Sequence, residues 1–206
     1  MKRIAWSVVL LLLITSGCGT ASNTSPDTTF QSGEGSGKVN EQKEDQNLDL
    51  SSYRPDTGVT KTFTSQKKPM FTEYIVDQNE EYLQRVITLG DMKTAQVIKW
   101  TEDRAAIVEQ SDSSNKESML DEFEAVEEVE TILLQPHNEE EIEITLLDNV
   151  EVPYGEFDHV LKVSGNQGDE VEITTYYAEG VGMIKQVYEM TGDQRESEVA
   201  ELATIQ

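Results

Sequence analysis

The chain has 206 residues, 36% of them hydrophobic and 27% charged, and a formal net charge of −24 at pH 7. Residues 1–100 carry 12 acids and 11 bases, whereas residues 101–206 carry 28 acids and 5 bases, so the excess negative charge lies almost entirely in the second half. Because phosphate binding needs clustered Lys and Arg, this balance argues against nucleic acid as a partner and against direct adhesion to an anionic lipid surface.

The first 17 residues have the pattern of a signal peptide. Lys2 and Arg3 form a short positive region, residues 4–14 are apolar except for Ser7, and residues 15–17 are small. The apolar run is shorter than the roughly 20 residues that a membrane-spanning helix needs. We therefore predict that the chain is exported and that residues 1–17 are removed.

The one cysteine follows this segment directly, in the sequence Thr15-Ser16-Gly17-Cys18. These four residues resemble the lipobox of bacterial lipoproteins, although Thr15 stands where most lipoboxes have Leu. The resemblance implies lipid, such as diacylglycerol and palmitate, on Cys18 and a lipid-anchored, extracytoplasmic place at the bacterial cell membrane. The alternative is an ordinary secretory signal followed by an unpaired thiol.

Residues 18–52 are predicted to be the lipidated cysteine and a flexible linker. They are rich in Ser, Thr, Gly and Asn, and the large apolar residues among them are Phe30, Val39, Leu48 and Leu50. So little apolar surface does not support a packed core. The folded domain is therefore expected over residues 53–206.

Beyond Tyr53, apolar residues fall at every second position in short segments, which is the pattern of β-strands. Expected strands cover residues 70–76, 82–89, 96–100, 105–110, 141–146, 157–163, 171–177 and 184–190, with turns at 76–79, 89–91 and 165–168. Met119, Phe123 and Val126 recur at helical spacing, which predicts one short helix within 118–130. The predicted fold is mostly β: a single antiparallel curved sheet or half-open barrel with one short helix.

The sequence offers little equipment for catalysis or metal binding. No G-x-S-x-G turn and no calcium loop of the form D-x-[DN]-x-[DN]-G is present. The two histidines are His137, in a polar segment, and His159, which is expected to be partly buried beside Phe157 and Leu161. We predict no catalytic residue, no metal site and no cofactor, with an envelope hydrolase that uses paired carboxylates as the minority alternative.

Two segments near the end resemble a closing signature of many uncharacterised bacterial envelope lipoproteins. The first is Val152-Pro153-Tyr154-Gly155-Glu156-Phe157, and the second runs from Thr175 to Lys185 with the sequence TYYAEGVGMIK. In general plan those proteins are similar to the half-barrels of the lipoprotein carrier and receptor group. The resemblance implies a curved sheet around a helix or an apolar cavity, with Gly180 and Gly182 permitting positive φ or close backbone approach.

These observations leave two binding functions open. In the first, the concave face accepts a lipid or other apolar ligand, and the aromatic residues that would face it are Phe71, Trp100, Phe157 and Tyr177. In the second, the acidic surface docks an envelope protein or a cationic partner, and that binding would weaken steeply with salt.

The proposed anchor gives the first testable prediction. Mass spectrometry of the mature protein should find Cys18 as its first residue, with lipid attached to the sulfur. A mature product on which Cys18 is unmodified would contradict the assignment.

Overall fold

The computed structural model describes residues 48–206 apart from 114–116, 124–129, 135–141, 168–170 and 191–195. Strands make up most of these residues, and within them the two helical elements are short 3-10 turns, η1 (Leu50–Tyr53) and η2 (Leu120–Glu122). The strands are β1 (Thr60–Ser65), β2 (Lys68–Gln78), β3 (Tyr82–Leu89), β4 (Met92–Trp100), β5 (Arg104–Ser111), β6 (Glu130–Leu134), β7 (Ile142–Val152), β8 (Gly155–Gln167), β9 (Val171–Ala178), β10 (Gly182–Met190) and β11 (Ser197–Ile205).

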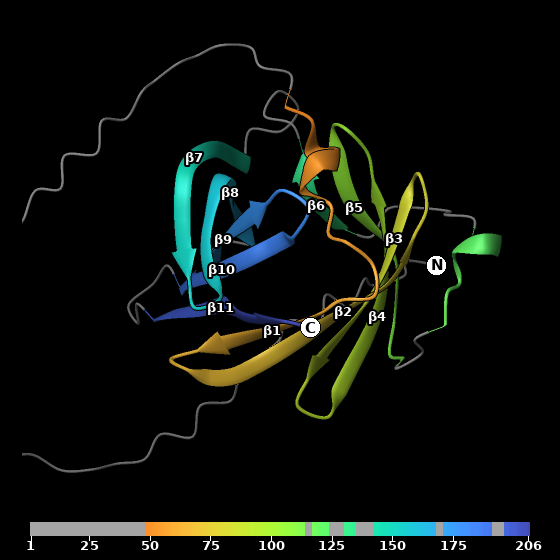
Figure 1. The fold of residues 1–206 in the computed structure, drawn as a ribbon, viewed down its shortest axis with the longest axis horizontal. Coiled ribbons are helices and arrows are strands. Elements are labelled where there is room, and N and C mark those ends of the chain that lie inside the picture. The colour runs from red at the N-terminus through yellow and green to blue at the C-terminus, as the bar shows by residue number, and fades with distance from the viewer. Residues whose placement is uncertain (1–47, 114–116, 124–129, 135–141, 168–170, 191–195) are drawn as a thin grey trace, which may run out of the picture. The chain divides into compact units, whose positions relative to one another are not determined.

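All of these strands belong to one antiparallel sheet in the order β6-β5-β4-β3-β2-β1-β11-β10-β9-β8-β7. Neighbours in the sheet are neighbours in sequence, except that β1 pairs with β11 in the middle. The sheet curls on itself into a half-barrel whose two edge strands are β6 and β7 (Figure 1). This confirms the predicted fold class.

The curl brings the two halves of the sheet to the same core. One apolar cluster combines Phe63, Ile75 and Ile98 from the first half with Leu161 and Leu202 from the second, all of them fully buried. Phe63 and Leu202 are cross-strand partners and so lie on the same face of the sheet, which is the concave face.

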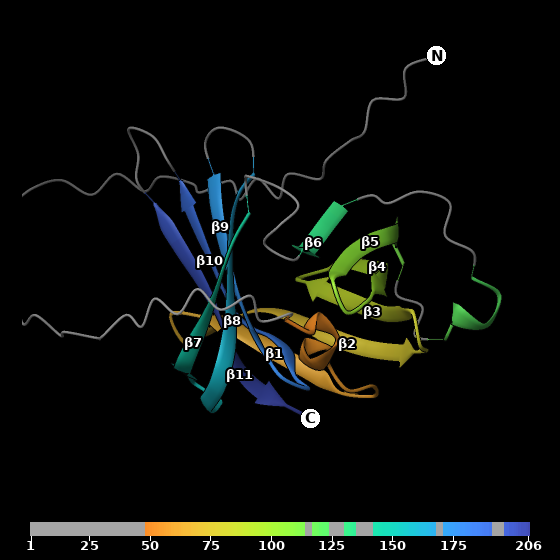
Figure 2. The same ribbon diagram turned by 90° about the horizontal axis from the view of Figure 1, so that it is seen from above.

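The turn η1 lies between the two halves of the sheet (Figure 2). Leu50 and Tyr53 are buried in the core cluster. The carbonyl oxygen of Leu50 accepts a hydrogen bond from the indole Nε1 of Trp100 at 2.8 Å, and the Tyr53 hydroxyl donates to the carbonyl oxygen of His159 at 3.1 Å. Leu48 packs against the same cluster, so Leu48 to Ser52, which we had assigned to the linker, are part of the folded unit.

A second, smaller cluster covers the convex face. Val97, Val108 and Leu120 are buried there, with Tyr82 and Phe123 packed against them. The Gln84 side chain fixes this segment, because its amide donates to the carbonyl oxygen of Glu117 and accepts from the amide of Met119. The sequence predicted a short helix within 118–130. In the described residues of that range the helical element is the single 3-10 turn η2, so the prediction is wrong there. Residues 124–129 lie outside the described residues.

The structure adds three strands that apolar alternation did not predict: β1, β6 and β11. The turn at 89–91 is confirmed, with Gly90 at φ 57°. The other two expected turns were placed too early, because β2 continues to Gln78 and β8 to Gln167, inside the ranges 76–79 and 165–168. His159 is exposed rather than partly buried. It has φ 52° and lies opposite Asp148, at the one point between Ile142 and Val152 where the pairing of β7 with β8 is interrupted. His137 lies outside the described residues.

No helix in the described ranges has the length and apolar character needed to cross a bilayer.

The two glycines of the closing signature have different surroundings. Gly180 and Gly182 both have positive φ, 69° and 74°, as predicted. A side chain at Gly180 would meet open space, whereas a Cβ at Gly182 would lie 3.1 Å from Cδ of Pro55, the residue that follows η1 by two positions. Gly182 therefore permits both the left-handed backbone and the approach of the N-terminal segment.

We expect Gly182→Ala to destabilise the protein more than Gly180→Ala. Each substitution should cost about 1–2 kcal/mol for the left-handed conformation, and Gly182→Ala adds the contact with Pro55. Urea unfolding of both variants measures the difference, and equal losses would show that the contact with Pro55 has no effect.

Candidate functional site: a charged row on the concave face

Three charged side chains lie on the concave face among the apolar core residues. The Glu73 carboxylate is 2.6 Å from Nζ of Lys61 through Oε2 and 2.8 Å from Nη1 of Arg85 through Oε1. The Lys61 and Glu73 side chains are only 1% and 3% exposed, and Arg85 is 15% exposed. The concave face is therefore not wholly apolar.

Lys61 is fully engaged in these contacts. Besides Glu73, its Nζ donates to the carbonyl oxygens of Val181 at 3.0 Å and Met183 at 3.2 Å. The Lys61 nitrogen is thus surrounded by acceptors alone, one carboxylate and two carbonyl oxygens, which suits an ammonium group. The lysine thereby joins β1 to the beginning of β10.

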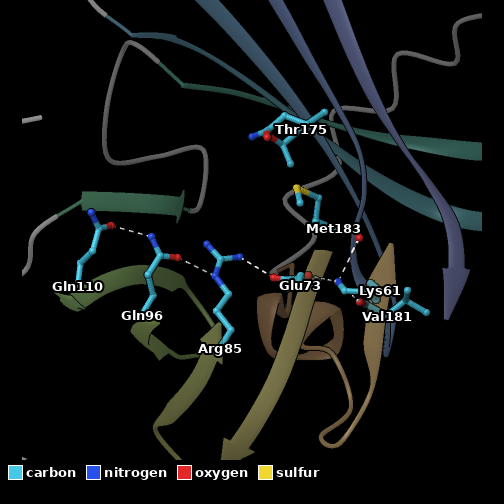
Figure 3. A network of polar contacts seen from close by, with 9 residues as sticks. Lys61, Glu73, Arg85, Gln96, Gln110, Thr175, Val181 and Met183 are labelled. Carbon is cyan, nitrogen blue, oxygen red and sulfur yellow. Dashed lines mark hydrogen bonds and ion pairs between the residues drawn. The ribbon is translucent and has the colours of Figure 1, made fainter. Parts of the chain in front are cut away.

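Two side-chain amides extend this line of contacts. We call the five residues the charged row: Lys61, Glu73, Arg85, Gln96 and Gln110. Nε of Arg85 donates to Oε1 of Gln96 at 2.8 Å, and the Gln96 amide donates to Gln110 at 2.7 Å. Sheet register produces this order, because Lys61 pairs with Glu73, Arg85 with Gln96, and Gln96 with Gln110 across neighbouring strands. Figure 3 shows the five side chains in sequence across β1 to β5, with Thr175 facing them.

A second polar group lies on the facing wall of the half-barrel, on β9 and β10. The Tyr188 hydroxyl donates to the Gln186 side chain at 2.5 Å, and the Gln186 amide donates to the Thr175 hydroxyl at 3.1 Å. Burial raises the pKa of Tyr188, with Glu198 adding to the rise and the positive charge of Arg85 opposing it. Burial likewise raises the pKa of Tyr177, so both phenols stay neutral near pH 7.

The Glu73 carboxyl is held in its ionised form. Burial by itself would raise its pKa, but the charges of Lys61 and Arg85 and the hydrogen bonds that they donate outweigh burial and lower the pKa from 4.5 to about 2. Burial also lowers the pKa of Lys61, against the attraction of Glu73. With two cations and one carboxylate, the row carries one net positive charge inside a strongly acidic protein.

The four aromatic residues that we predicted to face a ligand all belong to the core cluster. Trp100 and Tyr177 are buried, and Trp100 is bound to η1 through its indole nitrogen. Phe71 and Phe157 are partly exposed; Phe71 stacks on Phe63 at 4.5 Å between ring centroids, and Phe157 stacks on Tyr154 at 6.0 Å. The structure thus brings the four residues to one cluster, and whether they contact a ligand stays a prediction.

Sequence reasoning missed Lys61, Glu73 and Arg85, although a signal was available. Glu73 stands between Phe71 and Ile75 at strand spacing, and Arg85 stands between Leu83 and Ile87. A charged residue at an inward position of an apolar strand needs an opposite charge nearby. Reading the alternation for such exceptions would have found the acid and one of its two partners.

The Glu73 carboxylate is poorly suited to act as a general base. A carboxylate with a pKa of about 2 is a poor proton acceptor near neutral pH, since an effective general base has a pKa close to the working pH. Among the described residues, no group of three or more His, Cys, Asp or Glu side chains is placed to hold a metal ion.

Comparisons with known proteins give little further information. No protein-family model matches the chain, and no curated protein matches it. A solved structure of a Bacteroides fragilis protein, described as exported and as having a YmcC-like fold, aligns with 74% of this chain and 97% of its own length. Its TM-score is 0.42 and its sequence identity 10%.

The charged row predicts a specific pH dependence of stability. We expect Glu73→Gln to lose about 3–5 kcal/mol at pH 7, because it leaves two buried cations without their counter-charge. The Glu73 pKa is depressed on folding, so its contribution is complete above about pH 4.5 and is lost as pH falls towards about 2. The difference between wild type and variant should therefore shrink over that interval in denaturant unfolding measurements.

Glu201→Gln is the matched control. Glu201 forms an ion pair with Lys185 at 2.9 Å, but both side chains are partly exposed. Removing this pair should cost less than about 1 kcal/mol. A Glu73→Gln loss that stays constant from pH 7 to pH 2.5 would contradict the proposed ionisation.

Proposed function

We propose that this chain is a non-catalytic, extracytoplasmic lipoprotein, held at the membrane through lipid on Cys18, and that its half-barrel binds a lipid or other apolar ligand on the concave face. The signal-peptide pattern and the lipobox resemblance support the location. The exposure of large apolar side chains at the ends of the concave face supports the ligand class.

The observation that carries this proposal is a set of apolar cross-strand partners that extends from the buried core to the edge of the sheet. Tyr177 pairs with Leu161, and Leu161 pairs with Leu146 of the edge strand β7. Paired residues face the same side of a sheet, so Leu146 lies on the concave face. Its exposed fraction is 49%, whereas Leu161 is fully buried.

Two methionines are likewise exposed apolar side chains on the concave face, near the ends of their strands. Met190 shares the face of Tyr188, two residues earlier on β10, and is 51% exposed. Met92 pairs with Leu89, which alternates with Arg85 on β3, and is 55% exposed. Flexible apolar side chains of this kind adapt to acyl chains of varied shape. Exposed apolar surface that continues from a core is typical of a binding surface.

This function predicts that apolar ligands copurify with the mature protein and that a charge at the rim reduces their occupancy. Native mass spectrometry of the mature protein should detect bound acyl species. In Leu146→Glu the bound fraction should fall severalfold, because the carboxylate would be desolvated beneath a ligand.

Met119→Glu is the matched control, because Met119 is 42% exposed but lies beside η2, next to the cluster of the convex face. It should leave occupancy unchanged. An equal effect of the two substitutions would contradict a concave-face site, and a mature protein that neither copurifies with nor takes up any apolar ligand would contradict the ligand class.

A further inference from the structure

Arg85 is the member of the charged row whose hydrogen-bonding capacity is not used up. Its Nε donates to Gln96 and its Nη1 to Glu73, while its Nη2 makes none of the hydrogen bonds or ion pairs found among the described residues. A guanidinium carries more N–H donors than these two bonds use. Because the side chain keeps 15% exposure, the unused end remains within reach of a bound molecule.

Stability alone does not account for the buried charges. Apolar residues of similar volume in place of a buried ion pair often leave stability unchanged or improve it. Here the row also carries an unbalanced positive charge, since Lys61 and Arg85 face one carboxylate. Across the half-barrel the charge of Arg85 acts on the phenols of Tyr177 and Tyr188, which are neutral. The carboxylates of Glu198 and Glu130 act on Tyr188, but among the described residues the one ion pair of Arg85 is with Glu73.

An apolar track leads away from Arg85 along the same face. Ile87 and Leu89 follow at every second position of β3, both half-buried, and Met92 at the beginning of β4 is the exposed partner of Leu89. From Arg85 to Leu89 the strand rises about 13 Å. The face therefore presents one cation followed by a run of apolar side chains.

We propose that the free end of the Arg85 guanidinium binds the carboxylate head group of a fatty acid, whose acyl chain lies along Ile87, Leu89 and Met92. One carboxylate balances the single excess charge of the row, and a guanidinium matches its planar geometry. A phosphate monoester would bring more negative charge than the row can balance. This inference rests on the apolar-ligand function proposed above and names the head group.

Photo-crosslinking tests the head group on the mature lipoprotein in nanodiscs. The probes are dodecanoic acid and dodecanol, each with the same diazirine in the chain, and the readout is label on peptides from β3 and β4. We expect the acid to label wild type roughly tenfold more than the alcohol, as expected for a charge-assisted hydrogen bond. Arg85→Gln should lower labelling by the acid to that by the alcohol, which should not change.

A second variant serves if Arg85→Gln does not fold. Gln96→Glu keeps an acceptor for Nε of Arg85, 2.8 Å away, and places a competing carboxylate beside the guanidinium. It should abolish the preference for the acid. Arg104→Gln, which removes an arginine on the other face of the sheet, should retain the preference.

The outcomes separate the two proposals. Equal labelling of wild type by acid and alcohol, or a preference that survives in Gln96→Glu or in folded Arg85→Gln, would overturn the head-group assignment while leaving apolar binding in place. Absence of labelling by both probes would overturn the proposed ligand class and the head group together.

Discussion

The Glu73 carboxylate is the group on which the interior of the half-barrel depends. It lies between two cations from the neighbouring strands β1 and β3, and it positions Lys61 to donate to two carbonyl oxygens at the beginning of β10. One buried acid therefore orders four strands from both halves of the sheet. Removing its charge leaves two desolvated cations inside an apolar core, which is among the costliest defects that a single substitution can produce.

The concave face changes in character from one end to the other. At one end η1 fills the space between the halves, with Leu50 and Tyr53 buried and bonded to both of them. The charged row crosses the middle. Further along β3 and β10, Leu89 is half-buried and Met190 is exposed. A surface that is closed at one end, cationic in the middle and apolar at the rim is suited to an amphiphile with its head group inside.

Alternating apolar residues were enough to predict the fold class and most strands, because one face of the sheet is buried over most of its length. The missed strands lacked that signal. In β1 the inward position 61 is a lysine, and β11 has the sequence SEVAELATI, whose Ala, Leu and Glu are good helix formers. Pairing with β1 and β10 overrides this local preference. The alternation could have drawn attention to Glu73 and Arg85 as inward charged residues, but it could not predict their contacts, because these depend on the register of five strands.

The pairing of β1 with β11 has a consequence for how the protein folds. All other strand pairs in the sheet are between consecutive strands and can form as local hairpins, so β1 to β6 and β7 to β11 are each a simple meander. Among the described strands, the pairing of Lys61–Thr64 with Glu201–Ile205 joins the two meanders into one sheet, across about 140 residues of sequence. Loop-closure entropy makes that junction the slowest contact to form. The strand that follows all the others in chain order, β11, is thus the one that merges two separate sheets into one.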